Sequence, residues 1–304
     1  MAIRHLPFQS SSLVLFVLLV PVLTVDRLAD ALSGFADVRA AVTAVQADVV
    51  YTRSFPVREG QALAVEVGSG DVRVETTAAR EASVVVTGTG RDARAEFERL
   101  RFTAGVQGGL LVVRTYPPRT FRPRRVDARF VYTVRVPRRF DVAVSTGSGN
   151  VTVGSVNGRL TLDTGSGDVV AGDVQGPAVS VDTGSGDVRL GRVEGVLSVD
   201  TGSGNVAVAR QDGRASVGTG SGDVEVRLDR MAALDVETGS GDVRLTLPRG
   251  TGADVRIDGG DVRIDEALAF AGRRERREAV GRIGRGGERL NVETGSGSVA
   301  LIAR

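Results

Sequence analysis

The sequence contains no cysteine, no tryptophan and no lysine, and it has a single histidine, His5. Without cysteine the chain can form neither a disulfide nor a thiolate metal site, and cysteine lipidation is not possible. A mature chain that lost its N-terminus would also lack imidazole, the side chain most used for acid–base catalysis near neutral pH. These absences argue against histidine- or cysteine-dependent enzymes.

Aromatic residues make up only 4% of the chain, whereas glycine occurs 40 times among 304 residues. Few aromatic side chains argue against a large aromatic-lined pocket, and abundant glycine suits tight turns around thin strands. The net charge of +2 gives no sign of nucleic-acid binding. The hydrophobic share of 41% is enough for one or two sizeable cores, so we expect a folded protein.

The N-terminus has the pattern of a targeting segment. Arg4 and His5 precede an apolar run from Leu13 to Val25, which suits a signal-peptide core and is short for a membrane span of about 20 residues. We expect residues 1–25 to be a signal peptide or, alternatively, an anchor that contacts the membrane. Residues 26–50 follow as a linker with helical spacing of apolar residues. The expected location is the periplasm or cell surface, with membrane anchoring as the alternative.

A repeat dominates the second half of the chain. Thr-Gly-Ser-Gly occurs seven times between Thr146 and Gly297, and the valine of the GSG[DN]V turn recurs every 18 or 19 residues from Val151 to Val243. A fixed period of this length is typical of a solenoid. Two alternating apolar–polar runs in each unit leave no room for a helix. We therefore predict an all-β fold in which residues 146–304 form a single-stranded, right-handed parallel β-helix with 18–19-residue coils.

Residues 51–145 show strand-like runs with longer connections and no fixed repeat, although residues 68–72 already contain the GSGDV turn. We expect an irregular N-terminal β cap that closes the first edge of the solenoid. At the other end the chain stops soon after the last coil. We expect the inserted segment from Glu266 to Gly287 to cover the edge of that coil and keep the protein a monomer.

The glycines of the repeat are predicted to be structural, because they reach backbone angles that other residues adopt only at a cost. These turn glycines are Gly147, Gly149, Gly165, Gly167, Gly184, Gly186, Gly202, Gly204, Gly220, Gly222, Gly239, Gly241, Gly295 and Gly297. Continuing the strand alternation through the motif places both Thr201 and Ser203 on the interior side. A phosphate-binding glycine loop is disfavoured, since a strand and not a helix follows each copy.

The acidic residue after each turn has two candidate roles. As a turn residue it accepts a backbone N–H, and the presence of Asn150 and Asn205 at this position favours that role. As a calcium ligand it is similar to half of a β-roll motif, but one turn per coil supplies too few converging carboxylates. The weak calcium candidates are Asp168, Asp187, Asp223 and Asp242. We therefore predict no metal site and no cofactor.

Other charged residues surround these turns. Outward-facing acids are expected at Asp163, Asp182, Asp200, Glu237 and Glu293, and Arg189, Arg244 and Arg263 are alternative partners for the turn acids. Two arginine clusters are candidates for contact with acidic polysaccharide, lipid headgroups or another protein. Their members are Arg122, Arg124, Arg125, Arg273, Arg274, Arg276 and Arg277. The simpler interpretation is that they are solvated loops, because Glu275 and Glu278 interleave with the second cluster.

The order of these segments resembles a bacterial family of β-strand-repeat proteins called "putative adhesins", whose function is unknown. The resemblance covers about Phe55 to Arg304 and rests on "FPVREGQALAVEVGSGDVRVE", the serial TGSGDV coils and the terminal "LNVETGSGSVAL". It implies a β-helix, commonly with an N-terminal signal or anchor. It supplies no catalytic residues.

We therefore expect a non-catalytic, exported or surface β-solenoid that acts as an adhesin-like binding scaffold. Its expected partner is an envelope polysaccharide or another protein, and not nucleic acid. One alternative is a membrane-anchored envelope-stress or sensory accessory protein. Another is a polysaccharide-cleaving β-helix enzyme, which the even repetition of the acids disfavours because an active site must differ from its neighbours.

Overall fold

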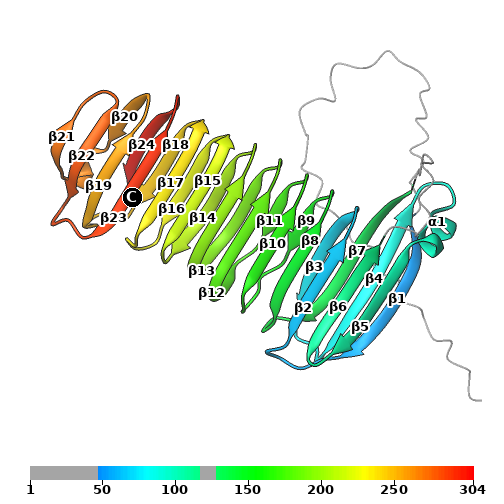
Figure 1. Ribbon diagram of the computed structural model, residues 1–304. Helices are drawn as coiled ribbons and strands as arrows, with labels where there is room; N and C mark the ends of the chain where they lie inside the picture. Colours follow the sequence, from blue (N-terminus) through cyan, green and yellow to red (C-terminus); the bar gives the residue numbers. More distant parts are fainter. Residues whose placement is uncertain (1–46, 117–127) are drawn as a thin grey trace, which may run out of the picture. The chain divides into compact units, whose positions relative to one another are not determined.

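The computed structural model describes residues 47–116 and 128–304. The predicted signal peptide or anchor and most of the predicted linker lie outside these residues. The described part consists of β-strands, one short helix, α1 (Ala93–Arg99), and a 3₁₀ turn, η1 (Glu266–Leu268). None of its helices is long and apolar enough to cross a membrane. The chain is therefore all-β, as expected, and its coils stack one on the next (Figure 1).

Two faces of hydrogen-bonded strands enclose the core. The first face runs, in spatial order, through β5 (Arg101–Gln107), β6 (Leu110–Tyr116), β2 (Ala62–Val67), β8 (Asp141–Thr146), β10 (Leu160–Thr164), β12 (Val174–Thr183), β13 (Val188–Thr201), β15 (Ala215–Ser221), β17 (Leu234–Ser240), β23 (Glu288–Thr294), β19 (Ala253–Asp258), β22 (Glu278–Ile283) and β21 (Phe270–Arg274).

The second face shares β13 with the first, because that long strand bends from one face into the other. It runs through β1 (Asp48–Pro56), β4 (Glu81–Thr89), β7 (Arg129–Pro137), β3 (Asp71–Thr77), β9 (Val151–Val153), β11 (Val169–Ala171), β13, β14 (Val206–Asp212), β16 (Val224–Leu228), β18 (Val243–Leu247), β24 (Ser298–Ala303) and β20 (Asp261–Ile264).

The central coils pair in parallel and in constant register. Leu162 lies opposite Val181, and Val181 lies opposite Val199, so equivalent residues of successive coils stack on one another. All three are buried, as alternation of apolar and polar residues along a strand predicts. The inward residues of both faces form one continuous core. The 18–19-residue period is therefore the length of one coil.

The N-terminal part begins the same stacking and then closes it. β2 and β3 pair in parallel with β8 and β9, whereas β1, β4 and β5 add antiparallel pairs outside them. Aromatic side chains fill this end, with the rings of Tyr51 and Phe102 4.6 Å apart and Phe97 packed on Phe102 at 5.1 Å. Antiparallel strands and aromatic rings thus replace the repeating valines where the parallel coils stop.

The last coils do not stack in the order of the sequence. Leu290 of β23 lies opposite Leu234 of β17 on one side and opposite Val255 of β19 on the other. The final coil is therefore inserted between two earlier ones. The expectation that the inserted segment covers the final coil is wrong: β22 pairs antiparallel with β19, which belongs to the preceding coil. β22 pairs with one edge of β19, and β23 of the final coil pairs with the opposite edge of β19, the edge that faces β17.

Candidate functional site

The turns formed by Thr-Gly-Ser-Gly stack along one edge of the coils. A β-carbon on Gly184 would lie 2.5 Å from the carbonyl oxygen of Gly165 in the preceding coil, and one on Gly186 would lie still closer to that of Gly167. Only glycine fits where backbones approach this closely. The hydroxyl of Thr201 donates to the carbonyl oxygen of Gly186 across 3.4 Å. The repeated motif therefore makes a close-packed corner between coils.

The serine of the motif lies outside this corner. Thr201 is only 6% exposed, as predicted, but Ser203 is exposed and its predicted interior position is wrong. The backbone bends from Gly202 to Gly204, so the alternation of a straight strand does not continue through the turn.

The Asp or Asn after each turn connects its coil to the next, and we call this row the turn ladder. Oδ1 of Asp187 accepts the backbone N–H of Asn205 at 3.0 Å, and the N–H of Asp187 itself is donated to Oδ1 of Asp168 at 3.0 Å. Asn205 accepts the N–H of Asp223 in the same way, at 2.9 Å. Asn supplies the same oxygen as Asp, so these bonds do not require a charge.

Within the turn ladder, the surroundings of Asp187 favour its ionised carboxylate. The pKa of Asp187 is lowered, chiefly by the backbone N–H of Asn205 and also by Arg189, whose Nη2 lies 2.6 Å from Oδ2. Arg263 pairs in the same way with Asp261, at 2.9 Å. The calcium candidates Asp168, Asp187, Asp223 and Asp242 all belong to this ladder. Residues 47–116 and 128–304 contain no group of three acids or histidines placed to hold a metal.

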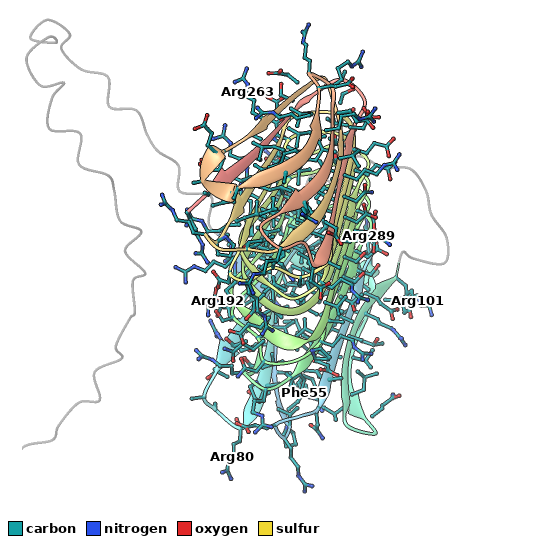
Figure 2. All side chains as sticks on the ribbon, turned by 90° about the vertical axis from the view of Figure 1, so that its left-hand side faces the viewer. Phe55, Arg80, Arg101, Arg192, Arg263 and Arg289 are labelled. Carbon is teal, nitrogen blue, oxygen red and sulfur yellow. The ribbon has the colours of Figure 1, made fainter. Side chains whose placement is uncertain are left out.

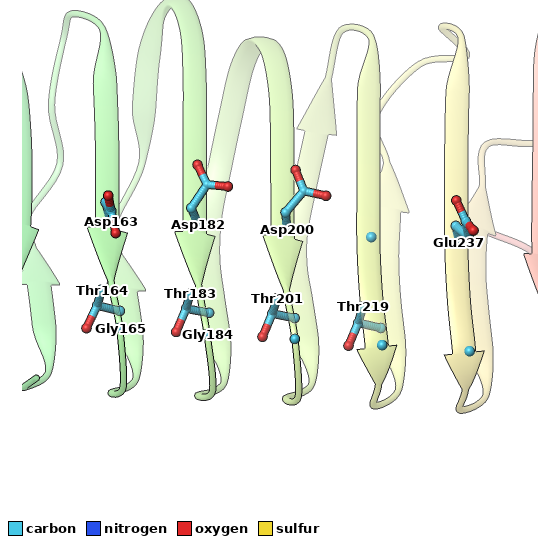
Figure 3. A pocket seen from close by; sticks show the side chains of 14 residues that line it. Asp163, Thr164, Gly165, Asp182, Thr183, Gly184, Asp200, Thr201, Thr219 and Glu237 are labelled. Carbon is cyan, nitrogen blue, oxygen red and sulfur yellow. The ribbon is translucent and has the colours of Figure 1, made fainter. Parts of the chain in front are cut away.

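A second row of acids crosses the outer surface of the first face (Figure 3). Asp163, Asp182 and Asp200 lie opposite one another in adjacent strands, and the row continues through Gly218 to Glu237. We call the four acids the face ladder. With the threonines and glycines of the turns they line an open hollow of about 690 Å³. Adjacent strands are about 4.8 Å apart, so like charges repeat at that interval.

The pKa of Asp182 in the face ladder is shifted in the opposite direction to that of Asp187 in the turn ladder. Burial raises the pKa of Asp182, and the carboxylates of Asp200 and Asp163 raise it further. Within the described residues, none of the four acids has an ion-pair partner. Architecture alone gives no reason to place these charges side by side.

A larger hollow of about 1180 Å³ lies on the same face toward the C-terminal coils, and we call it the charged groove. Its floor includes the small side chains of Ser198, Ser216 and Ala233 together with Val196, which is 50% exposed. Its charged lining consists of Arg214, Arg256, Arg289, Asp235, Asp254 and Glu293. Arg289 projects outward from the coils in Figure 2. Sequence reasoning missed the three arginines, because they are far apart in the sequence and only strand register brings them together.

The predicted anion-binding arginines fall in two places. Arg122, Arg124 and Arg125 lie outside the described residues. Arg273, Arg274, Arg276 and Arg277 are exposed on the hairpin of β21 and β22.

Part of this second cluster has local structural contacts. Nη2 of Arg273 lies 2.6 Å from Oε2 of Glu278. The backbone carbonyls of Arg276 and Arg277 accept N–H bonds from Val262 at 2.9 Å and Gly259 at 2.8 Å, so the turn covers the edge of β20. Anion binding by the guanidinium groups stays a prediction.

Residues 61–301 match the family described as Toastrack DUF4097. A solved "putative adhesin" from Parabacteroides distasonis is 12% identical, with a TM-score of 0.50 over 83% of this chain and 96% of its own. A "putative adhesin" from Bacteroides fragilis is 14% identical over the same shares, with a TM-score of 0.47. A "putative lipid binding protein" from P. distasonis is 14% identical over 84% and 96%, with a TM-score of 0.34. No curated protein matches the chain. At these identities the likeness concerns the fold alone.

Proposed function

Because this chain belongs to the Toastrack DUF4097 family and has its solenoid-like all-β fold, we propose that it is a non-catalytic scaffold that binds an envelope polysaccharide. The polymer lies on the outer surface of the first face, along the face ladder. The observation that carries this proposal is the row of like charges without ion-pair partners in the described part of the chain. Residues that break a local stability rule without compensation concentrate at functional sites.

The chemistry of this surface suits a chain of sugars. Carboxylates accept hydrogen bonds from hydroxyl groups, and the outward Ser180 and Ser198, which lie opposite each other beside Asp182 and Asp200, can both donate and accept. A hydroxyl beside a carboxylate also occurs in the preceding coil, at Thr161 and Asp163, so a repeating polymer can use equivalent contacts on three successive coils. Asp163, Asp182 and Asp200 are evenly repeated along the face, which argues against a catalytic centre.

The proposal includes export to the periplasm or cell surface, with residues 1–25 as signal peptide or anchor. It also includes a right-handed coil, since β-crossover connections strongly favour that hand. Mass spectrometry of the N-terminus of the mature protein, combined with cell fractionation, tests the first point. Retention of the whole chain in the cytoplasm would contradict export.

Affinity electrophoresis against neutral, acidic and amino-sugar polysaccharides tests binding. The double variant Asp182→Ala and Asp200→Ala should lose retardation by any polymer that slows the original protein. Glu225→Ala is the matched control, because Glu225 is an exposed acid on the second face. Equal retardation of all three proteins would contradict a role for the face ladder, and no retardation by any polymer would contradict the proposed function.

A further inference from the structure

The charged groove has two long sides that carry opposite charges. On one side lie Arg214 and Arg289, two strands apart. Arg214 directly precedes Ala215 and Arg289 directly precedes Leu290, and both of these following residues are aligned with Leu234 of β17. The small Ala233, which directly precedes Leu234, lies between the two arginines. On the other side Glu293 lines the groove, and Glu237 of the face ladder, which lies just beyond the lining, is opposite Glu293 in the adjacent strand. The groove therefore separates a cationic edge from an anionic one.

The width of the groove keeps these charges from neutralising one another. Arg289 and Glu293 are four residues apart in β23, a separation of about 13 Å along an extended strand. Among the described residues, Arg214, Arg256 and Arg289 have no ion-pair partner. Both edges are thus available to a ligand that carries both signs of charge.

The remaining acids leave this division in place. Asp235 accepts a hydrogen bond from Nδ2 of Asn291 at 2.9 Å and lies near the middle of the groove. Asp254 lies opposite Arg289 at the C-terminal end. Arg214 therefore lies away from the acid opposite Arg289, and Arg256, the third arginine of the lining, lies opposite Asn291.

We propose that the charged groove binds a zwitterionic polysaccharide, with its carboxylates toward Arg214 and Arg289 and its amino groups toward Glu237 and Glu293. Guanidinium and carboxylate groups bind charged partners through charge-assisted hydrogen bonds. The serines of the floor face the sugar hydroxyls. This assignment rests on the proposed function, because both place a polysaccharide on the first face, and it names the charge pattern of the polymer.

A polysaccharide suits the groove better than an extended peptide does. The strands under the groove, β13, β15, β17, β23 and β19, are hydrogen-bonded to neighbours on both sides. No free backbone edge is left there to pair with a peptide strand. A second copy of the chain suits it less, since two concave surfaces facing each other would enclose a void.

Three polymers of related β-linked backbone separate the charge requirements: carboxymethyl chitosan carries both charges, carboxymethyl cellulose is anionic and chitosan is cationic. Binding is measured by isothermal titration calorimetry below the pKa of the amino groups. The original protein should bind the zwitterionic polymer at least about tenfold more tightly than either of the others, the effect of one charge-assisted contact. The double variant Arg214→Gln and Arg289→Gln should lose the preference over chitosan. The double variant Glu237→Gln and Glu293→Gln should lose the preference over carboxymethyl cellulose.

The control is Glu225→Gln with Arg244→Gln, a register pair on the second face, and it should bind as the original protein does. Equal binding of all three polymers, unaffected by the groove variants, would overturn the groove assignment while leaving polysaccharide binding by the scaffold intact. Absence of binding to every polymer, including the panel used for the face ladder, would overturn both. Tighter binding of a mixed Lys/Glu peptide, or a doubled mass in solution that the arginine variant abolishes, would replace the polysaccharide with a peptide or a second copy.

Discussion

Aspartates recur at intervals of 18 or 19 residues in both the turn ladder and the face ladder, but the pKa values of Asp187 and Asp182 are shifted in opposite directions. In the turn ladder a carboxylate such as Asp187 receives a backbone N–H from the next coil, and its pKa is lowered. In the face ladder Asp182 has acidic neighbours in both adjacent strands, and its pKa is raised. Repetition of an acid therefore does not by itself indicate its role. The groups that surround the carboxylate decide it.

The acids of the turn ladder have a structural role, whereas those of the face ladder have none within the described residues. Each Asp or Asn of the turn ladder accepts a backbone N–H from the next coil, so coil-to-coil bonding explains these residues. The face ladder includes Asp182, whose pKa is raised by burial and by its acidic neighbours, and its four acids have no ion-pair partner within the described residues. It is the part of the repeat that a ligand would stabilise.

Substitution of the first glycine of the Thr-Gly-Ser-Gly motif should cause the largest loss of stability. Gly184→Ala should destabilise the protein by more than about 2 kcal/mol, because the new β-carbon would collide with the backbone of Gly165. Gly68→Ala is the matched control, since it changes the equivalent glycine of the first GSGD turn, where a β-carbon would meet nothing within 4 Å. Urea denaturation measures both. Similar losses would show that close stacking does not explain the glycine.

The buried threonine should have the next largest effect. Thr219→Val keeps the shape of the side chain and removes the hydroxyl that donates to the carbonyl oxygen of Gly204 at 3.1 Å. We expect a loss of about 1 kcal/mol in the free energy of unfolding, the usual net value of one hydrogen bond. Ser216→Ala, on the exposed surface of the same strand, is the control and should change little. Unchanged stability in Thr219→Val would mean that the corner is held by glycine packing alone.

Asp182→Asn should stabilise the protein at neutral pH, by less than about 1 kcal/mol because the side chain is largely exposed. The folded-state pKa of Asp182 is raised, so its destabilising effect is complete above that pKa and fades as the pH falls toward about 4. Thermal melts between pH 7 and pH 4 should show the advantage of the variant shrinking. An advantage that grows on acidification would contradict repulsion in the face ladder.

Asp187→Asn should have the smallest effect, within about 0.5 kcal/mol at neutral pH, because Asn keeps the acceptor for the N–H of Asn205. The stability difference between Asp187→Asn and the original protein should change with pH in the opposite direction to that of Asp182→Asn. The pKa of Asp187 is lowered in the fold, so the stability that its charge adds is present at neutral pH and is lost as the pH falls through that pKa.

Calcium provides a separate check of the turn ladder. Melting temperatures with EDTA and with excess Ca²⁺ should coincide for the original protein and for Asp187→Asn. If Ca²⁺ raised the melting temperature of the original protein by many degrees and did not raise that of Asp187→Asn, the turn ladder would be a metal site.

Much of the fold could be predicted because the repeat appears in short stretches of neighbouring residues along the chain. The alternation around Leu197 and Val199 predicts which side chains are buried, and both are buried. The position of Ser203 could not be found in this way, because alternation holds only while the strand is straight.

The sequence by itself determined the coil: its 18–19-residue length, the inward valines and a motif whose glycines permit backbone contact between turns. Those features depend on spacing along the chain, which fixes the contacts of each coil with equivalent positions in the next. Only the tertiary structure decided that β23 lies between β17 and β19 and that Arg214 and Arg289 share a groove. These arrangements depend on the pairing of both edges of β19, with β22 on one side and β23 on the other, and a strand edge can pair with any strand of suitable register, whatever its place in the sequence.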